Sequence, residues 1–223
     1  MEGFRVLEIK QSVFESNDRE ADKLRAELKK DKVFLLNLMS SPGSGKTTTL
    51  RRTIAALKDE FRIGVMEADI DSDVDAATIE KTGAKVIQLH TGGMCHLDAG
   101  MTRQGLEGLD VNDVDFAILE NIGNLVCPAD FDTGCHRRIM LLSVPEGWDK
   151  VCKYPPMFAV VDALIVTKCD YLPLNEDFDM EALKEHARIL NPKLDIFVTS
   201  ARTGEGMDDV AAWVFEKRKQ MLS

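Results

Sequence analysis

The residues with the clearest chemical meaning form a phosphate-binding loop. Residues 40–47 read Ser-Ser-Pro-Gly-Ser-Gly-Lys-Thr, between an apolar run and a helical pattern. They match the P-loop pattern G-x-x-x-x-G-K-[ST], with serine in place of the first glycine. Gly43 and Gly45 let consecutive N–H groups turn toward one anion, while Lys46 reaches the phosphates and Thr47 binds Mg²⁺. We expect nucleotide contacts from the following residues: Gly43, Ser44, Gly45, Lys46, Thr47 and Thr48.

A second pair of motifs indicates that the base is guanine. Thr167-Lys168-Cys169-Asp170 ends an apolar strand and is similar to the N-K-x-D element of GTPases. Asp170 would accept hydrogen bonds from guanine N1 and N2, for which adenine has no matching donors, and the Lys168 stem would pack on the purine. Thr167 replaces the usual Asn, which we expect to weaken a tie between loops. Downstream, Ser200-Ala201 begins an S-A-[KL]-like element whose backbone N–H would meet guanine O6.

Acidic residues at strand ends predict a magnesium site beside the phosphate loop. Glu120-Asn-Ile-Gly123 ends a strand where most GTPases carry D-x-x-G, so Gly123 would meet the γ-phosphate and Glu120 would orient Mg²⁺ through water. Upstream, residues 67–75 hold five carboxylates in nine positions. Like charges this dense are costly unless a cation or water neutralises them. We expect Asp69 and Asp75 to bind Mg²⁺. The predicted catalytic residues are Lys46, Thr47, Asp75 and Glu120.

Sulfur and imidazole side chains suggest a separate site for a soft metal. Cys95-His96 follows two glycines at the start of a predicted helix, where a thiolate is favoured, and Cys127 follows the Glu120 strand. These ligand types favour Zn²⁺, Ni²⁺ or Cu⁺ over Mg²⁺. Three ligands are incomplete, so a water or the same site of a two-fold-related subunit would complete them. Cys135-His136 is an auxiliary candidate. The remaining cysteines, Cys152 and Cys169, are expected to be structural.

The elements that must position these residues alternate between apolar runs and helical patterns. We predict strands over residues 33–39, 62–68, 85–89, 115–120, 138–144, 160–167 and 194–199. We predict helices over residues 17–30, 46–58, 73–82, 95–107, 179–190 and 207–220, the first with Asn17 and Glu20 spaced as a capping box. Continuously apolar strands are typical of strands covered on both faces. The pattern therefore predicts an α/β P-loop NTPase fold, a mostly parallel sheet of about seven strands with helices on both faces.

Composition narrows the function classes. The chain has 223 residues, 44% of them hydrophobic and 30% charged, and a net charge of −10. An acidic balance argues against a general binder of nucleic acid or of anionic membranes. No apolar run approaches the roughly 20 residues of a membrane span, and the N-terminus lacks a signal-peptide pattern, so we expect a cytoplasmic protein. We expect an N-terminal helical lead over residues 1–32 and one P-loop GTPase domain over residues 33–223.

Four strings together resemble one family. They are Ser-Pro-Gly-Ser-Gly-Lys-Thr at 41–47, Gly-Gly-Met-Cys-His-Leu-Asp-Ala at 92–99, Glu-Asn-Ile-Gly-Asn-Leu-Val-Cys-Pro at 120–128 and Lys-Tyr-Pro-Pro-Met-Phe at 153–158. They are similar to the nickel-insertion GTPases of hydrogenase maturation, the HypB family, and the resemblance covers nearly the whole chain from about residue 33 onward.

The resemblance implies a low-turnover GTPase that forms a homodimer with nucleotide bound. It implies nickel or zinc at the dimer interface on the positions matching Cys95, His96 and Cys127, and a Lys153 that reaches toward the nucleotide or the partner subunit. It also implies delivery of nickel to the hydrogenase large subunit with the zinc-containing partner HypA. Residues 1–32 contain no Cys or His, so storage of many nickel ions is not expected. Gly100 replaces a His of some relatives, which removes a ligand for a second metal.

The two predicted sites share one segment, because Cys127 lies four residues after Gly123. Loss of the γ-phosphate would move this segment and change the Cys127–metal bond. Three alternatives remain at this point. A urease-type nickel GTPase would carry Cys-Pro-His, where this chain has Cys127-Pro128-Ala129. A P-loop small-molecule kinase would prefer ATP, against Asp170. A nucleotide-stabilised metal-binding module would bind GTP without significant turnover.

Overall fold

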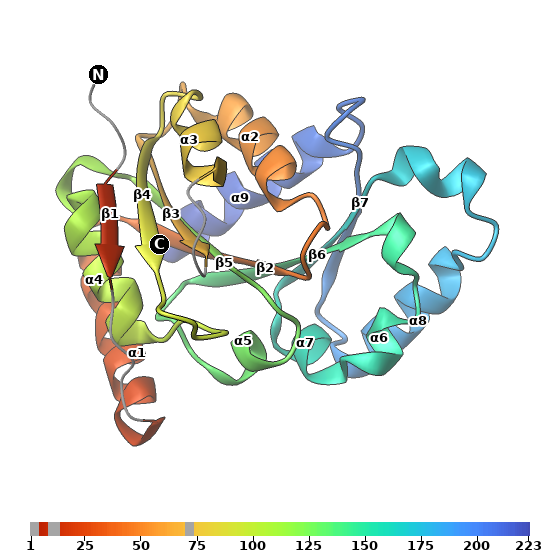
Figure 1. Cartoon of the computed structure of the whole chain (residues 1–223), viewed down its shortest axis with the longest axis horizontal. Coiled ribbons are helices and arrows are strands. Elements are labelled where there is room, and N and C mark those ends of the chain that lie inside the picture. The colour runs from red at the N-terminus through yellow and green to blue at the C-terminus, as the bar shows by residue number, and fades with distance from the viewer. Residues whose placement is uncertain (1–4, 9–13, 70–73) are drawn as a thin grey trace.

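A computed structural model describes residues 5–8, 14–69 and 74–223 of the chain (Figure 1). The strands are β1 (Arg5–Glu8), β2 (Phe34–Ser40), β3 (Ile63–Asp69), β4 (Lys85–His90), β5 (Phe116–Gly123), β6 (Arg137–Ser143), β7 (Ala163–Thr167) and β8 (Asp195–Val198). The helices are α1 (Phe14–Lys30), α2 (Lys46–Leu57), α3 (Val74–Glu80), α4 (Ala99–Leu109), α5 (Cys127–Asp130), α6 (Lys150–Lys153), α7 (Pro155–Val160), α8 (Met180–Leu190) and α9 (Met207–Leu222). Short 3₁₀ turns are η1 (Val111–Asp113), η2 (Val144–Glu146) and η3 (Cys169–Leu174).

The described strands form one sheet in the order β1-β4-β3-β5-β2-β6-β7-β8, and every neighbouring pair is parallel. The predicted α/β fold is confirmed, and each of the seven predicted strands is present. An eighth strand, β1, pairs with β4 at the edge and lies in the segment predicted to be a helical lead. Its four residues are too few for hydrophobic periodicity to distinguish a strand from a loop.

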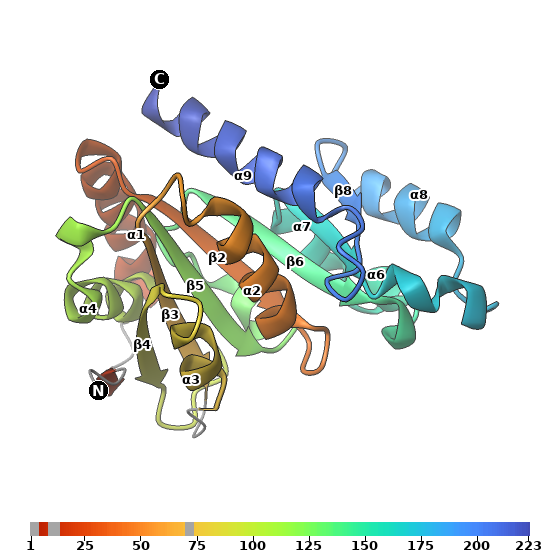
Figure 2. The ribbon, with the colours of Figure 1, turned by 90° about the horizontal axis from the view of Figure 1, so that it is seen from above.

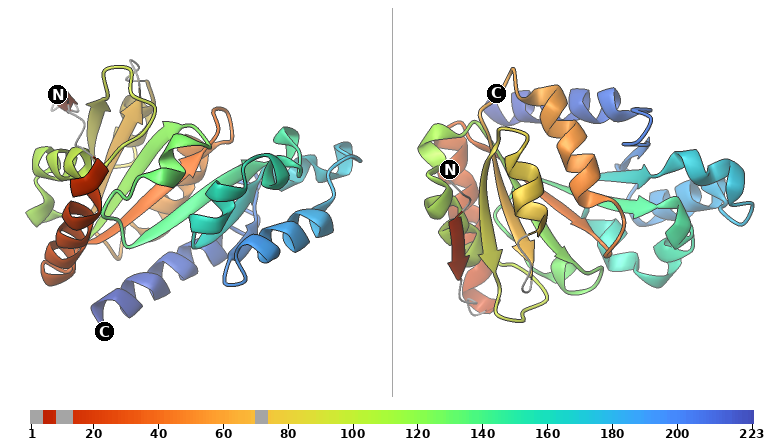
Figure 3. Two further views of the ribbon diagram at one scale, coloured as in Figure 1. Left: turned by 90° about the horizontal axis from the view of Figure 1, so that it is seen from below. Right: turned by 45° about the horizontal axis from the view of Figure 1, so that its top comes forward.

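Helices cover both faces of the sheet, as the continuously apolar strands predicted. Figure 2 shows α2, α3 and α9 over one face, and Figure 3 shows α1 and α4 on the other side, with α7 and α8 farther along it. Successive residues of β2 face opposite layers. Phe34 and Leu36 pack in the cluster with Ile54 of α2, while Leu35 packs with Leu24 of α1. A third cluster joins the far end of the sheet to α7 and α8.

Several predicted boundaries were wrong. The helix predicted over 95–107 begins at Ala99, because the Asp98 side chain accepts the Met101 N–H and caps the helix there. The strand predicted over 160–167 begins at Ala163, because residues 155–160 form α7. The strand predicted to end at Glu120 continues to Gly123.

The predicted capping box of the first helix is also wrong. Asn17 lies inside α1, which begins at Phe14, and its side chain bonds to distant backbone instead. The apolar face predicted for this helix is confirmed, since Ala21, Leu24 and Leu28 are buried. Among the helices of the described residues, none has the combined length and apolar character that crossing a bilayer requires.

Candidate functional site

The phosphate loop has the local geometry that its sequence predicts. Gly43 and Gly45 adopt φ values of +76° and +94°, in the left-handed region that favours glycine. Gly45 is the N-cap of α2, so the helix N-terminus opens directly from the loop. The Lys46 ammonium donates to Ser40 Oγ at 3.2 Å. The serine that departs from the general pattern therefore supplies a hydrogen-bond acceptor to the phosphate-loop lysine.

Two hydrogen bonds join the phosphate loop to the end of β7. Thr167 Oγ1 donates to the Ser44 carbonyl at 2.6 Å, and Lys168 Nζ donates to the Gly43 carbonyl at 2.7 Å. The tie that we expected Thr167 to weaken is thus made by its hydroxyl. These contacts fix the loop that would read the base relative to the loop that would hold the phosphates.

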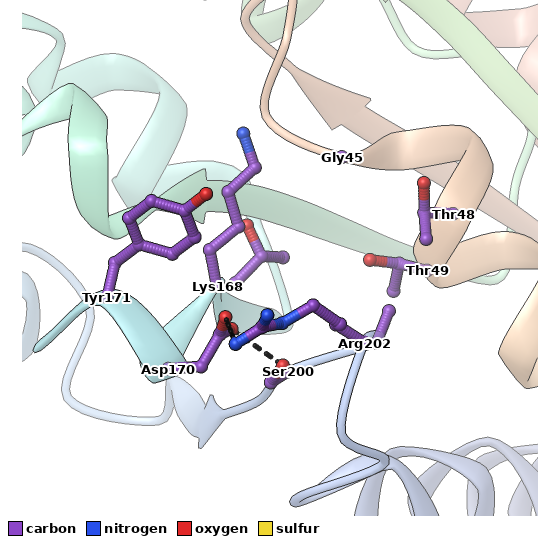
Figure 4. Close-up of a pocket in the computed structure, with 10 residues that line it drawn as sticks. Gly45, Thr48, Thr49, Lys168, Asp170, Tyr171, Ser200 and Arg202 are labelled. Atoms are coloured by element: carbon purple, nitrogen blue, oxygen red, sulfur yellow. Dashed lines mark hydrogen bonds and ion pairs between the residues drawn. The ribbon is translucent and has the colours of Figure 1, made fainter.

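A pocket of about 200 Å³ lies between these two loops and the 200–206 turn (Figure 4). Its lining residues are Gly45, Thr48, Thr49, Thr167, Lys168, Asp170, Tyr171, Ser200, Ala201 and Arg202. The structure therefore brings the predicted residues of the base site together. Sequence reasoning missed Thr49, Tyr171 and Arg202, which adjoin the predicted motifs but whose side-chain directions depend on the packed loops.

Asp170 is placed as an ionised acceptor in this pocket. Ser200 Oγ donates to its Oδ1 at 2.7 Å, and Arg202 Nη2 lies 3.0 Å from its Oδ2. The Ser200 hydroxyl, aided by the Arg202 charge, holds the pKa of Asp170 below its ordinary value. The Asp170 side chain is only 10% exposed. A carboxylate held in this way suits a ligand edge with two adjacent N–H donors.

Oxygen-bearing side chains gather beside the phosphate loop at the ends of β3 and β5. Thr47 Oγ1 lies 3.5 Å from Glu120 Oε1. Glu67 and Glu120 are paired residues of the two strands, so their side chains emerge on the same face of the sheet, and both are buried. Hydroxyl and carboxylate oxygens are the ligands that Mg²⁺ prefers, and two buried neighbouring carboxylates favour a cation. These residues therefore fit Mg²⁺.

Glu67 was missed by sequence reasoning, although it belongs to the acidic run at residues 67–75. Of the residues predicted there, Asp69 ends β3 and Asp75 lies in the first turn of α3. The side chains of Asp69 and Asp75 lie outside the described part of the structure. Asp71 and Asp73 lie wholly outside it. Their expected role in binding Mg²⁺ stays a prediction.

The fold brings the two candidate metal-binding thiols together from different segments. Cys95 Sγ lies 2.9 Å from Cys127 Sγ and 3.9 Å from His96 Nδ1. The hydrogen bond to Cys127 raises the pKa of the Cys95 thiol, and partial burial adds to the rise. Cys95 precedes the Asp98 cap and is not in the first turn of a helix. The expectation that a helix N-terminus favours its thiolate is therefore wrong.

His96 is buried against an aromatic ring beside this thiol pair. Its imidazole stacks on Phe131 with the ring centroids 3.6 Å apart, and burial lowers the pKa of His96. Within the described residues, no three His, Cys, Asp or Glu side chains converge closely enough to hold a metal ion. One chain therefore presents two thiols with an adjacent neutral imidazole, a partial set of soft ligands.

Short contacts link the phosphate loop to these thiols. A Cβ atom on Gly123 would lie 3.1 Å from the Pro42 backbone nitrogen, so β5 ends in close approach to the phosphate loop. The next residue, Asn124, donates from Nδ2 to the Cys95 carbonyl at 3.1 Å and accepts the Val126 N–H at 2.9 Å. One continuous segment thus touches both candidate sites.

Asn17 of α1 supports the segments that carry the candidate metal ligands. Its Oδ1 accepts the Ala99 N–H at 2.9 Å, and its Nδ2 donates to the Asp132 carbonyl at 3.0 Å. The buried amide therefore bridges the segments that follow His96 and Cys127. Sequence reasoning missed Asn17 and Asn124 as positioning residues, because an amide carries no signal of its distant partners.

Some predicted residues lie elsewhere. Lys153 does not line the described pocket, and it pairs with Asp149 at 2.5 Å. Cys135 is buried in the core, where desolvation raises the pKa of its thiol. His136 Nδ1 accepts the Leu35 N–H at 3.0 Å, and burial lowers the pKa of His136 to about 4. The Cys135-His136 pair is thus a packed structural element and not an open auxiliary site.

Comparisons with known proteins agree with this arrangement. The family model of the CobW/HypB/UreG nucleotide-binding domain matches residues 34–198. The hydrogenase maturation factor HypB of Azotobacter vinelandii is 45% identical over 218 residues, which span 98% of this chain and 72% of that protein.

Two solved structures have the same fold. The crystal structure of HypB from Helicobacter pylori in complex with nickel has a TM-score of 0.86 and 39% identity, covering 92% of this chain and 96% of that one. The crystal structure of HypB from Archaeoglobus fulgidus has a TM-score of 0.84 and 34% identity, covering 92% and 99%. Together with the phosphate loop and the paired thiols, these matches show that the chain belongs to the HypB family of hydrogenase maturation factors.

Proposed function

We propose that the chain is a GTP-hydrolysing metallochaperone, in which the state of the nucleotide controls how nickel or zinc is held. Its metal ligands are Cys95, His96 and Cys127, and its cargo is nickel for [NiFe]-hydrogenase maturation. The nickel-bound HypB of Helicobacter pylori supports nickel as the cargo. The paired thiols support a soft metal at this place.

The pocket supports GTP as the nucleotide. Asp170 presents two oxygens that match guanine N1 and N2, and Ala201, which also lines the pocket, would offer a backbone N–H to guanine O6. Adenine lacks the two N–H donors that this carboxylate would meet on guanine, so it would gain fewer hydrogen bonds here. The pocket meets the phosphate loop at Gly45, so a base in the pocket would direct the phosphates toward Lys46 and Thr47, the next two residues.

The residues beside the phosphate loop support hydrolysis. Lys46, which bonds to Ser40, would contact the phosphates. Thr47 and Glu120 would hold Mg²⁺ directly or through water, and Asp75 is proposed to complete this set. When bound, Mg²⁺ neutralises charge that develops on the transferred phosphoryl group. The nucleophile is water, and slow turnover is expected because we identify no Gln or His that would position it.

The observation that carries the coupling is the segment from Gly123 to Cys127. Gly123 packs against Pro42 of the phosphate loop, and Asn124 bonds to the backbone of Cys95. A change at the γ-phosphate would therefore shift both thiols, because a segment of only five residues, 123–127, contacts the phosphate loop and the Cys95 backbone. Because the described residues of one chain gather only a partial ligand set, we propose that a homodimer formed with nucleotide completes the metal site across its interface. Lys153 is proposed to face the nucleotide or the partner subunit there.

The homodimer is proposed to receive or release nickel through HypA and to deliver it to the hydrogenase large subunit. Membership of a family of hydrogenase maturation factors supports a role with the hydrogenase maturation machinery, to which these proposed partners belong. The chain is proposed to act in the cytoplasm.

The experiment compares metal binding in two nucleotide states. Nickel and zinc are titrated into the protein with GDP and with a non-hydrolysable GTP analogue, and the oligomeric state is measured by light scattering in each. We expect metal affinity and dimer content to differ between the two nucleotides. Cys95→Ala and Cys127→Ala should each lose metal affinity, and Lys46→Ala should lose the nucleotide effect and release no phosphate from GTP.

Three results would contradict the proposal. Equal metal affinity and equal oligomeric state with both nucleotides would remove the coupling. Unchanged metal affinity in both cysteine variants would remove the metal site. Phosphate release from wild type no faster than from Lys46→Ala would leave a metal-binding module that keeps GTP without turning it over.

A further inference from the structure

The pocket that contains Asp170 also contains a positively charged side chain that competes for it. Arg202 lines the pocket, and its Nη2 lies 3.0 Å from Asp170 Oδ2. Figure 4 shows the Arg202 side chain extended along the pocket with its guanidinium at the carboxylate. The two partners differ in exposure, since the Arg202 side chain is 77% exposed and that of Asp170 is 10% exposed. The arginine therefore reaches in from solvent to a carboxylate that belongs to the pocket wall.

The guanidinium has the same hydrogen-bonding pattern as the base edge that Asp170 would read. Guanine presents N1–H and N2–H on two nitrogens joined through one carbon, and arginine presents N–H groups on nitrogens joined through its guanidinium carbon. Both patterns match the two oxygens of a carboxylate. Ser200 already bonds to Oδ1, so an arginine on Oδ2 occupies an acceptor that guanine needs.

We propose that Arg202 covers the base-reading carboxylate of Asp170 in the nucleotide-free protein, and that guanine binds by displacing it. Arg202 is then a residue that sets the affinity for guanine nucleotides by competing with them. The inference rests on the proposed binding of GTP. It implies that removing the side chain strengthens GDP and GTP binding, whereas a residue that simply contacts the base would weaken binding when removed.

The loop that carries Arg202 is held without this side chain. Arg52 Nε donates to the Ala201 carbonyl at 2.8 Å, linking the loop to α2. Within the loop, Thr203 N–H donates to Ser200 Oγ at 3.2 Å and Gly204 N–H donates to the Ser200 carbonyl at 2.8 Å. The guanidinium can therefore leave Asp170 while the backbone beside the base stays in place.

The test measures the affinity of GDP and of a non-hydrolysable GTP analogue by calorimetry. Wild type is compared with Arg202→Ala, Arg202→Gln and Arg202→Lys. Arg188→Ala is the matched control, because Arg188 is an exposed arginine of α8 that does not line the pocket. We expect Arg202→Ala and Arg202→Gln to bind both nucleotides about two- to tenfold more tightly, as expected for loss of a competing, partly exposed ion pair. Arg202→Lys, which keeps the charge, should lie between wild type and Arg202→Ala.

A double-mutant cycle tests whether the effect passes through Asp170. In Asp170→Asn the ion pair is absent, so adding Arg202→Ala should leave the affinity for xanthosine diphosphate unchanged. The increase in nucleotide affinity of Arg202→Ala over wild type should also shrink as salt rises from about 0.05 to 0.5 M, because salt screens exposed ion pairs.

The outcomes separate this inference from the proposed function. If wild type binds GDP but Arg202→Ala and Arg202→Gln bind it equally well or less tightly, the competition by Arg202 is refuted while GTP binding stands. An equal gain in the Asp170→Asn background would also refute it, because the effect would not involve the carboxylate. If wild type binds ATP in preference to GTP, the proposed function itself fails.

Discussion

Asn124 connects the two thiol-bearing segments through a hydrogen bond from its Nδ2 to the carbonyl of Cys95, at 3.1 Å. Its Oδ1 accepts the N–H of Val126, the residue before Cys127. One amide thus holds the backbone on both sides of the thiol pair. Because Asn124 directly follows Gly123, the same residue lies between the phosphate loop and the candidate metal site.

Asn124→Ala should weaken nickel binding without abolishing it. The substitution removes two hydrogen bonds that set the separation of the thiols, and a net loss of about 1 kcal/mol corresponds to about a fivefold fall in affinity. Competition titration with a nickel-binding dye measures this. Asn175→Ala is the matched control, since its amide also donates to a backbone carbonyl, that of Val144, at 3.2 Å. The same nickel affinity in both variants would show that Asn124 does not position the thiols.

Gly123→Ala should slow GTP hydrolysis. The new Cβ would lie 3.0–3.2 Å from atoms of Pro42, so the end of β5 and the phosphate loop must separate. Overpacking of this kind costs about 1–3 kcal/mol, and a cost of this size on the transition state corresponds to about a five- to hundredfold loss of phosphate release. GDP affinity and the melting temperature are measured in parallel, to distinguish a local effect from general unfolding. Wild-type turnover in a folded variant would show that this contact plays no part in hydrolysis.

Asp170→Asn should change the preferred base from guanine to xanthine. The carboxylate that accepts from guanine N1 and N2 becomes an amide whose N–H₂ group can donate to the xanthine 2-carbonyl. We expect GDP affinity to fall on the order of a hundredfold and xanthosine diphosphate binding to appear. Asp177→Asn, an exposed site outside the pocket, should bind GDP as wild type does. Retained GDP binding by Asp170→Asn would place the base elsewhere.

Folding stability should fall between about pH 6.5 and pH 4 because of His136. Burial lowers the pKa of this imidazole from 6.5 to about 4 in the folded chain. Between these values the unfolded state binds a proton that the folded state does not, so the free energy of unfolding decreases as the pH falls. A shift of this size corresponds to about 3 kcal/mol.

Urea unfolding at a series of pH values measures this dependence. His136→Asn is the informative variant, because the Asn Oδ1 can accept the Leu35 N–H that His136 Nδ1 accepts in wild type. The variant should lose part of the pH dependence between pH 6.5 and 4. An identical slope in both proteins would assign the effect to other groups.

Motifs whose chemistry depends on local backbone could be predicted from the sequence. Gly43 and Gly45 adopt the left-handed conformations that a phosphate loop requires, and Asp170 follows a strand as the guanine-binding pattern predicts. The seven apolar strands and their mostly parallel arrangement followed from the same local signal, because a strand covered on both faces has no polar side. Helix boundaries were predicted less well. The sequence suggested a helix start at Cys95, whereas the helix begins after the Asp98 cap.

The sequence by itself determined which residues carry the chemistry, because a phosphate loop, a base-reading aspartate and soft metal ligands are defined by residue type and short spacing. Only the tertiary structure decided which of them meet. Glu67 and Glu120 are neighbours in register on β3 and β5, Arg202 forms an ion pair with Asp170, and Cys95 lies beside Cys127. Strand order and register arise from packing the whole core, and no hydrophobic pattern within one segment specifies its neighbours.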